Sequence, residues 1–166
     1  RPSPGTATIL CAPLFHIGGA GSIAYNICMG IHTLLHRVFD PARVVDDMEN
    51  HPVSNTFMVP AMIMAVLQLP DIDKRDFSGL KQIFYGASPI SETVLRRAIE
   101  VFQARFVQMY GMTETCGTVV NLSPADHDRA LAGEPGLLQS CGRTSVGARL
   151  KVMDTQGVEV PNGEVG

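Results

Sequence analysis

The chain has 166 residues, of which 45% are hydrophobic and 17% are charged, and its formal net charge is −3. This length predicts one domain with a hydrophobic core of its own. The 13 basic residues are scattered along an acidic chain, which argues against nucleic acid as a partner.

Strands and helices alternate along the first two thirds of the chain. Strands are expected at residues 6–14, 37–39, 56–59, 80–85 and 105–110. Helical spacing of apolar residues runs from Ile17 to Leu34, follows the Asp40–Pro41 pair, covers residues 60–69 and follows Ser91.

Beyond Thr118 the pattern changes to strands alone. They are expected at residues 118–122 and 148–154, with a hairpin turn near Thr155-Gln156-Gly157. Five strands that alternate with four helices and are followed by β segments predict an α/β fold, namely a doubly wound, mostly parallel sheet with flanking helices and a C-terminal β extension. We divide the chain into an α/β subdomain at residues 1–122 and a linking β segment at residues 123–166.

The sequence shows no clear signal for membrane insertion, secretion or disulfide formation. The apolar stretch over residues 9–35 is interrupted by Pro13, His16, Asn26 and several glycines, so we expect no transmembrane helix. The four cysteines show no C-x-x-C pair and no metal-ligand spacing, a pattern typical of buried, reduced thiols in a cytosolic protein. No signal peptide is visible, and we predict a cytoplasmic location, with peripheral membrane association of a longer parent left open.

Three loops with unusual chemistry follow predicted strands, at residues 13–19, 85–89 and 110–114. Ligands of doubly wound sheets bind beyond the carboxyl ends of the strands, so these loops are expected to form one pocket. The segment at residues 108–115 is the most informative. The ring of Tyr110 can stack on a base, and Gly111 lets backbone approach a ligand. The hydroxyl of Thr113 can donate to phosphate oxygens, and the carboxylate of Glu114 can ligate Mg²⁺.

The motifs PLFHIGG, YGASPIS and YGMTET, in this order, resemble those of the adenylate-forming acyl-CoA synthetases, the superfamily that includes luciferases and nonribosomal adenylation domains. The stretch over residues 140–166 is similar to the segment that links the core of that family to a later β-barrel. Fatty and medium-chain acyl-CoA ligases resemble the chain most. The resemblance implies a fragment of the large N-terminal domain. It also implies a reaction in which a carboxylate attacks the α-phosphate of ATP, and coenzyme A then displaces AMP from the acyl-adenylate.

The resemblance also implies roles in an adenine and phosphate site. Tyr110 would stack on adenine, Thr113 would hold the α-phosphate and Glu114 would bind magnesium. Backbone along the other side of the base would come from Gly86, Ala87 and Ser88. The remaining residues implied to line the nucleotide are Gln108, Met109, Gly111 and Met112.

On the acyl side, the resemblance implies that His16 lies near the carboxylate, gates between the two half-reactions and is catalytic together with Thr113 and Glu114. The acyl chain would lie against His16, Ile17, Tyr25, Ile27 and Met29. Plainer interpretations stay open, because His16 also suits a hydrogen-bonded structural histidine, and Tyr25 and Met29 suit ordinary core positions of a helix. His127, in a Pro-Ala-Asp-His loop, is interpreted as structural.

Several elements of that family have no counterpart in this sequence. The phosphate loop with its lysine, the aspartate that holds the ribose and the C-terminal domain with its catalytic lysine are not matched, and Lys74, Lys81 and Lys151 lie in other contexts. We therefore expect an inactive fragment with half an active site. Its parent would be an acid–thiol ligase that uses ATP, Mg²⁺ and coenzyme A.

Two alternatives remain. Residues 19–24 fit G-x-G-x-x-A, and Asp40 closes the next predicted strand, which outlines the dinucleotide-binding fingerprint of a Rossmann oxidoreductase. Against it, the glycines lie inside a helical pattern. The other alternative is a non-catalytic fragment that binds acyl or adenine groups. The sequence leaves open the acyl length, aromatic against aliphatic acids, coenzyme A against a carrier protein as acceptor, and the oligomeric state.

Overall fold

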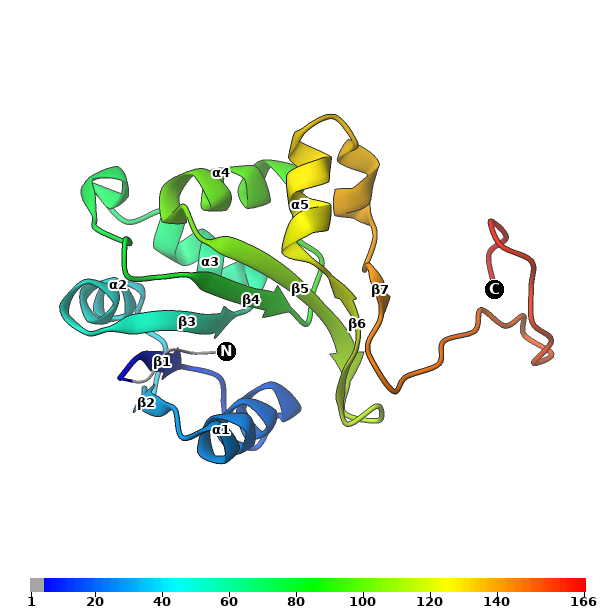
Figure 1. Ribbon diagram of the computed structural model, residues 1–166, viewed down its shortest axis with the longest axis horizontal. Helices are drawn as coiled ribbons and strands as arrows, with labels where there is room; N and C mark the ends of the chain where they lie inside the picture. Colours follow the sequence, from blue (N-terminus) through cyan, green and yellow to red (C-terminus); the bar gives the residue numbers. More distant parts are fainter. Residues whose placement is uncertain (1–4) are drawn as a thin grey trace.

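A seven-stranded sheet forms the centre of the protein in a computed structural model that describes residues 5–166 (Figure 1). Its strand order is β2-β1-β3-β4-β5-β6-β7. The strands are β1 (Ala7–Leu10), β2 (His32–Leu35), β3 (Val53–Met58), β4 (Gln82–Gly86), β5 (Arg105–Met112), β6 (Gly117–Leu122) and β7 (Arg143–Thr144). Strands β1 to β5 pair in parallel, and β6 and β7 are added antiparallel. The predicted mostly parallel α/β fold is confirmed.

Helices cover both faces of this sheet. They are α1 (Ile17–Met29), α2 (Pro41–Asn50), α3 (Pro60–Leu67), α4 (Glu92–Phe102) and α5 (Pro124–Leu131), with the short 3₁₀ helices η1 (Ile72–Lys74) and η2 (Pro135–Gln139). Figure 1 shows α3, α4 and α5 on one side of the sheet and α1 on the other. The core lies mainly under the first group, where Ile63, Leu95, Phe102 and Phe106 are almost fully buried.

Two helices begin at the caps that the sequence predicts. The carboxylate of Asp40 accepts hydrogen bonds from the N–H groups of Ala42 and Arg43 at 3.0 and 3.1 Å, with Pro41 in the first turn of α2. Ser91 accepts a hydrogen bond from the N–H of Val94 and starts α4. Both caps satisfy backbone donors that the first turn of a helix leaves unpaired.

The long helix predicted from residue 17 to residue 34 is wrong. Helix α1 ends at Met29, because Gly30 adopts a left-handed conformation with φ of 65° and its N–H bonds back to the carbonyl of Asn26. The following residues form the edge strand β2, which pairs with β1. The strand predicted at residues 37–39 is not present, because the chain has already left the sheet there.

The expectation of strands alone after Thr118 is also wrong. Ser123 and Asp126 form a capping box that starts helix α5. The strand that follows, β7, is only two residues long. The strand predicted at residues 148–154 is reduced to one isolated bridge between Met153 and Glu159, although the predicted turn near residues 155–157 is present. The division at residue 122 stays a prediction, and α5 and β7, which follow it, pack on the sheet.

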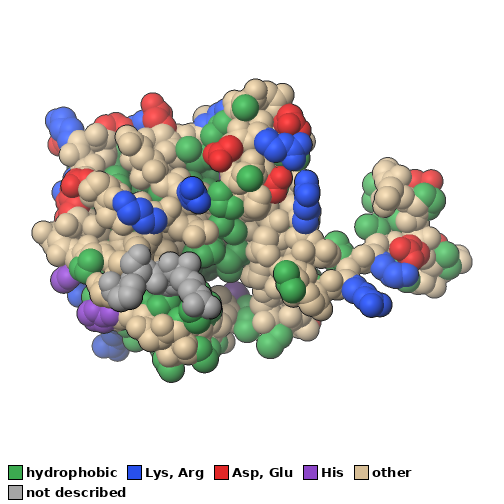
Figure 2. Space-filling view, in the orientation of Figure 1, with side chains coloured by type: hydrophobic (Ala, Val, Ile, Leu, Met, Phe, Trp, Pro, Cys, Tyr) green, Lys and Arg blue, Asp and Glu red, His purple; other side chains and the backbone are tan. Residues whose placement is uncertain are grey.

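The segment after β7 extends away from the sheet in Figure 1 and stands apart from the body in Figure 2. Its apolar side chains Val146, Val158 and Val165 are exposed by 60% or more. Acidic and basic side chains are interspersed on the face of the body shown in Figure 2. Within residues 5–166, none of the helices has the length and apolar character needed to cross a membrane.

The four cysteines are free thiols, as expected. The prediction that they are buried is wrong for Cys28 on α1 and for Cys116 in the turn before β6, which are exposed. Cys11 and Cys141 are half-buried, and burial raises the pKa of the Cys11 thiol to about 11.

Candidate functional site

The loops that follow β1, β4 and β5 lie at one edge of the sheet, because these three strands run in the same direction. The start of α1 reaches the hairpin between β5 and β6. A Cβ atom placed on Gly117 would lie 4.0 Å from Cγ1 of Ile17. The structure therefore brings the predicted acyl and adenine loops together on this edge.

The loop after β4 is held close to β5 by its backbone. A Cβ atom on Gly86 would lie 2.0 Å from the carbonyl oxygen of Met109, so only glycine fits at this position. The next residue, Ala87, has a φ of 67°, a left-handed conformation that costs a non-glycine residue about 1–3 kcal/mol. Ser88 follows on the exposed side. Strain of this kind is often found where a backbone is shaped for a ligand.

The hairpin after β5 is pinned by Thr115. Its hydroxyl oxygen accepts a hydrogen bond from the N–H of Met112 at 3.0 Å and lies 2.7 Å from the carbonyl oxygen of Gly117, to which it can donate. A Cβ atom on Gly111 would lie 1.9 Å from that same carbonyl oxygen. The sequence does not reveal this structural role of Thr115, because Thr113 and Thr115 have the same side chain and only their positions in the hairpin distinguish them.

The side chains of Thr113 and Glu114 are exposed at the tip of this hairpin, and within residues 5–166 neither has a hydrogen bond or an ion pair. Tyr110 and Met112 are each 45% exposed beside them. A hydroxyl, a carboxylate and an aromatic ring are thus available together at one end of the sheet.

Magnesium fits this arrangement. Nowhere in the described part of the chain do three potential metal ligands lie close enough to hold an ion without help. Magnesium in nucleotide sites is commonly bound by one or two carboxylates together with substrate phosphates and water, and Glu114 offers one such carboxylate.

His16 lies at the start of α1 and caps it. Its Nδ1 atom accepts a hydrogen bond from the N–H of Gly18 at 3.2 Å, and its ring is exposed. The cap uses Nδ1, and Nε2 has no hydrogen bond within residues 5–166.

The remaining residues predicted for the acyl wall lie on α1. Tyr25, Ile27 and Met29 are 52%, 74% and 43% exposed, so the alternative interpretation of Tyr25 and Met29 as core residues is wrong. Two residues of helix turn the side chain by about 200°, which places Ile27 on the opposite side of α1 from Tyr25 and Met29. The structure does not gather these three side chains on one face.

Behind the adenine loops lies a buried polar group that involves His127. Its Nε2 is 2.9 Å from the hydroxyl of Tyr85, its Nδ1 is 2.8 Å from the carbonyl oxygen of Ser123, and the Tyr85 hydroxyl is 3.4 Å from the amide of Gln108. His127 and Tyr85 are 2% and 1% exposed. Burial lowers the pKa of His127 and raises the pKa of Tyr85, which favours the neutral form of both.

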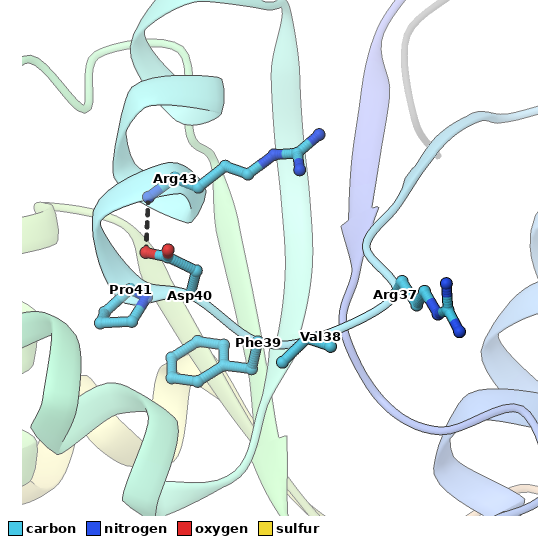
Figure 3. A pocket seen from close by; sticks show the side chains of 6 residues that line it. All are labelled: Arg37, Val38, Phe39, Asp40, Pro41 and Arg43. Atoms are coloured by element: carbon cyan, nitrogen blue, oxygen red, sulfur yellow. Dashed lines mark hydrogen bonds between the residues drawn. The ribbon is translucent and has the colours of Figure 1, made fainter.

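A hollow of about 510 Å³ lies beside the segment that connects β2 to α2 (Figure 3). It is lined by Arg37, Val38, Phe39, Asp40, Pro41 and Arg43. The Asp40 carboxylate is already engaged in capping α2.

These positions contradict the dinucleotide-binding alternative. A fingerprint of this type needs its glycines in the turn from strand to helix and a free carboxylate at the end of the next strand. Here Gly19 and Gly21 lie inside α1, and the carboxylate of Asp40 caps α2.

A mostly parallel α/β sheet whose loops meet at the carboxyl edge, with a hairpin that presents a ring, a hydroxyl and a carboxylate, is an arrangement in which nucleotides are commonly bound. The chain belongs to the family of AMP-binding enzymes, which it matches over residues 2–166.

Curated relatives share this family. The chain is 37% identical over 164 residues to a fatty acid–acyl-carrier-protein ligase of Streptomyces coeruleorubidus, an alignment that covers 98% of this chain and 30% of the relative. It is 36% identical over 158 residues to a medium/long-chain-fatty-acid–CoA ligase of Mycobacterium tuberculosis, covering 95% of this chain and 26% of that protein. The chain therefore spans less than a third of the length of these relatives.

Solved structures have the same fold. An amide bond synthetase of Marinactinospora thermotolerans superimposes with a TM-score of 0.83 at 25% identity, covering 96% of this chain and 31% of that one. The o-succinylbenzoate coenzyme A synthetase of Bacillus subtilis, solved in complex with ATP and magnesium ion, superimposes with a TM-score of 0.81 at 24% identity, covering 98% of this chain and 32% of that one.

Proposed function

We propose that this chain is the adenine- and acyl-binding part of an enzyme that activates a carboxylic acid with ATP and then transfers the acyl group to a thiol. The observation that carries the proposal is the hairpin tip, where the side chains of Thr113 and Glu114 have no partner among residues 5–166 and lie beside the half-exposed ring of Tyr110. Family membership and the ligase relatives support the same reaction class.

Each residue of the hairpin has a task in this reaction. The ring of Tyr110 stacks on the adenine, and the backbone of Gly86, Ala87 and Ser88 borders the base on the other side. The hydroxyl of Thr113 donates to an α-phosphate oxygen, on which negative charge grows as the carboxylate attacks. The carboxylate of Glu114 binds Mg²⁺, which neutralises phosphate charge when it is present. Such a reaction depends on positioning and charge neutralisation and needs no protein nucleophile.

The nucleotide is also bordered by side chains and backbone of β5, which include Gln108, Met109, Gly111 and Met112. His16, at the start of α1, faces the acid through Nε2 and is proposed to separate the two half-reactions. The acyl chain is proposed to follow α1 along Ile17, Tyr25, Ile27 and Met29, of which the last three need further protein or the substrate itself to cover them.

A fatty acid is the substrate class that we propose. The two relatives with the higher identities are named for fatty acids, whereas relatives at 30% identity are named for 4-coumarate and indoleacetate. The acceptor is coenzyme A or the phosphopantetheine of a carrier protein, because these two fatty-acid relatives differ in this respect. Parallel assays with both acceptors distinguish them.

Turnover is proposed for a longer polypeptide, because the relatives are more than three times as long as this chain. The chain by itself is expected to bind ligand without catalysing the reaction. A cytoplasmic location and the use of magnesium remain parts of this proposal.

The test in the full-length protein is acid-dependent exchange between ATP and pyrophosphate. Glu114→Ala should reduce the exchange rate by about 10²–10³-fold, the range found when one charge-stabilising group is removed from an active site. Glu100→Ala is the matched control, since Glu100 is exposed on α4 and pairs with Arg97 of the same helix. Exchange at the wild-type rate in Glu114→Ala would exclude the magnesium role.

For the chain alone, calorimetric titration with a non-hydrolysable acyl-adenylate mimic tests the site, with NADH as a rival ligand. Binding of the mimic that is lost in Tyr110→Ala supports the proposal. The non-catalytic alternative predicts the same binding but no exchange in the full-length protein, so the two experiments together separate it from the enzyme.

A further inference from the structure

The buried polar group behind the adenine loops has an unambiguous direction of hydrogen bonding. The carbonyl oxygen of Ser123 can only accept, so the proton shared with His127 is on Nδ1. The imidazole is neutral, because burial lowers its pKa, and its Nε2 atom therefore has a lone pair and no proton. Tyr85 must then donate its only proton to Nε2, across the 2.9 Å between them.

This donation determines the orientation of the Gln108 amide. The phenol oxygen of Tyr85 has no second proton, so it cannot donate to the Oε1 atom of Gln108 that the structure places 3.4 Å away, and two acceptors would face each other there. An amide donates through its NH₂ group, and a half-turn of the terminal torsion exchanges the NH₂ and the carbonyl oxygen within nearly the same volume. The NH₂ of Gln108 is thus directed to Tyr85, and its carbonyl oxygen is directed away.

Gln108 lies where it can contact a base. Gln108 and Tyr85 are register partners on the adjacent strands β5 and β4, so both side chains are on the same face of the sheet. Tyr110 is two residues further along β5, on the same face, and its ring is half-exposed. Apart from the contact with Tyr85, the amide of Gln108 has no hydrogen-bond partner within residues 5–166, and it is not among the buried unpaired groups.

We propose that Tyr85 and His127 are positioning residues for nucleobase selection. They hold the Gln108 amide with its oxygen toward the ligand, so that the site accepts a base with an amino group at position 6 and rejects a base with a carbonyl oxygen there. This inference rests on the proposed function, since it requires that a purine nucleotide stacks on Tyr110.

The test compares dissociation constants for ATP and for inosine 5′-triphosphate, in which an oxygen replaces the 6-amino group of adenine. The wild-type chain should prefer ATP by about tenfold or more. The Gln108 carbonyl oxygen accepts a hydrogen bond from the 6-amino group of ATP but faces another acceptor, the 6-oxygen, in inosine 5′-triphosphate. In Tyr85→Phe the amide can turn, and the preference should fall to about threefold or less. Thr56→Val, which removes a buried hydroxyl that donates to the carbonyl oxygen of Ile9 on β1, is the matched control and should keep the preference.

His127 gives a second pair of variants. His127→Gln keeps an acceptor for the Tyr85 proton and should retain most of the preference for ATP. His127→Leu removes the acceptor and should lose the preference. Loss of folding in His127→Leu, detected by circular dichroism, would leave the comparison of Tyr85→Phe with wild type as the deciding one.

A spectroscopic measurement tests the hydrogen-bond direction without any ligand. Long-range ¹H–¹⁵N spectra at neutral pH should show His127 as a neutral ring with its proton on Nδ1. A proton on Nε2 would overturn the inference. So would an unchanged ATP preference in Tyr85→Phe, or equal binding of both nucleotides by a wild-type chain that still needs Tyr110, and both results leave the proposed function intact. If neither nucleotide nor the acyl-adenylate mimic binds, the proposed function fails, and the inference fails with it.

Discussion

The adenine side and the acyl side of the proposed site differ in how much of each the packing of the chain holds in place. On the adenine side, Gly86 and Gly111 let neighbouring backbones approach so closely that an added Cβ atom would lie 2.0 and 1.9 Å from a carbonyl oxygen. On the acyl side only the start of α1 is fixed in this way, where a Cβ atom on Gly19 would lie 2.1 Å from the carbonyl oxygen of Pro13. The rest of α1 buries only Asn26 and exposes most of its large apolar side chains.

This difference suits the two proposed ligands, a nucleotide that is constant and an acid that varies between relatives. Backbone that is fixed by a sheet suits a nucleotide that is the same in every turnover, because a preorganised site loses little entropy on binding. A helix with exposed side chains can change its residues without disturbing the core. The relatives named for fatty acids, 4-coumarate and indoleacetate are in keeping with a variable acyl side.

The largest expected effect comes from adding one methyl group on each side. Gly86→Ala forces a Cβ atom against backbone and should lower the free energy of unfolding by about 3 kcal/mol or more. Gly21→Ala, in the middle of α1 with open space around it, should raise this free energy by about 0.5–1 kcal/mol. Urea denaturation measures both, and equal effects of the two variants would contradict the comparison.

The two half-exposed tyrosines give the next effect. Tyr110→Ala should weaken nucleotide binding by about 1–3 kcal/mol, the range for a base that stacks on an aromatic ring. Tyr25→Ala, on α1, should leave nucleotide binding unchanged within error. Calorimetric titration with ATP checks both variants. An unchanged affinity in Tyr110→Ala would remove this ring from the site.

Within the adenine side, the two threonines of the hairpin are expected to have different roles, one structural and one in nucleotide binding. Thr115→Val removes the hydroxyl that bonds Met112 and Gly117, and should cost about 1–2 kcal/mol of stability. Thr113→Val removes a hydroxyl without a protein partner and should change stability by less than about 0.5 kcal/mol, while it weakens nucleotide binding. Thermal unfolding and calorimetry together separate the two roles, and a stability loss in Thr113→Val as large as in Thr115→Val would contradict them.

We expect the smallest effect from pH, through the buried imidazole of His127. Burial lowers the pKa of His127 below its ordinary value of 6.5. As the pH falls below about 6.5, the unfolded chain therefore gains a proton that the folded chain does not yet bind, and stability decreases. The contribution of His127 is complete above about pH 6.5 and is lost as the pH falls through its lower folded pKa.

Urea midpoints measured between about pH 7.5 and pH 5 check this prediction. His127→Gln should flatten the dependence in this range. Asp126 is not expected to contribute there, because its pKa is lowered from 3.8 by hydrogen bonds with Ser123 and its stabilisation is lost only at more acid pH. The same slope in the variant as in wild type would contradict the assignment to His127.

Some of the fold and of the site could be predicted because the signals are local. The caps Asp40 and Ser91 start helices through bonds to residues two or three positions further on. The loops after β4 and β5 were placed at one edge because parallel strands alone dictate that arrangement.

Other features could not be predicted because they depend on distant partners. Apolar spacing from Ile17 continues through Leu34, and pairing of residues 32–35 with β1 turns that last part into an edge strand. His127 could be interpreted as structural, but its bond to Tyr85, 42 positions earlier in the chain, was not visible.

The sequence by itself determined the alternation of strands and helices, the caps and the motifs that carry the chemistry, since these depend on residues near one another in the chain. Only the tertiary structure decided where α1 ends, which threonine pins the hairpin and which side chains stay exposed. These outcomes follow from backbone pairing and burial between segments far apart in sequence, which local propensity does not contain.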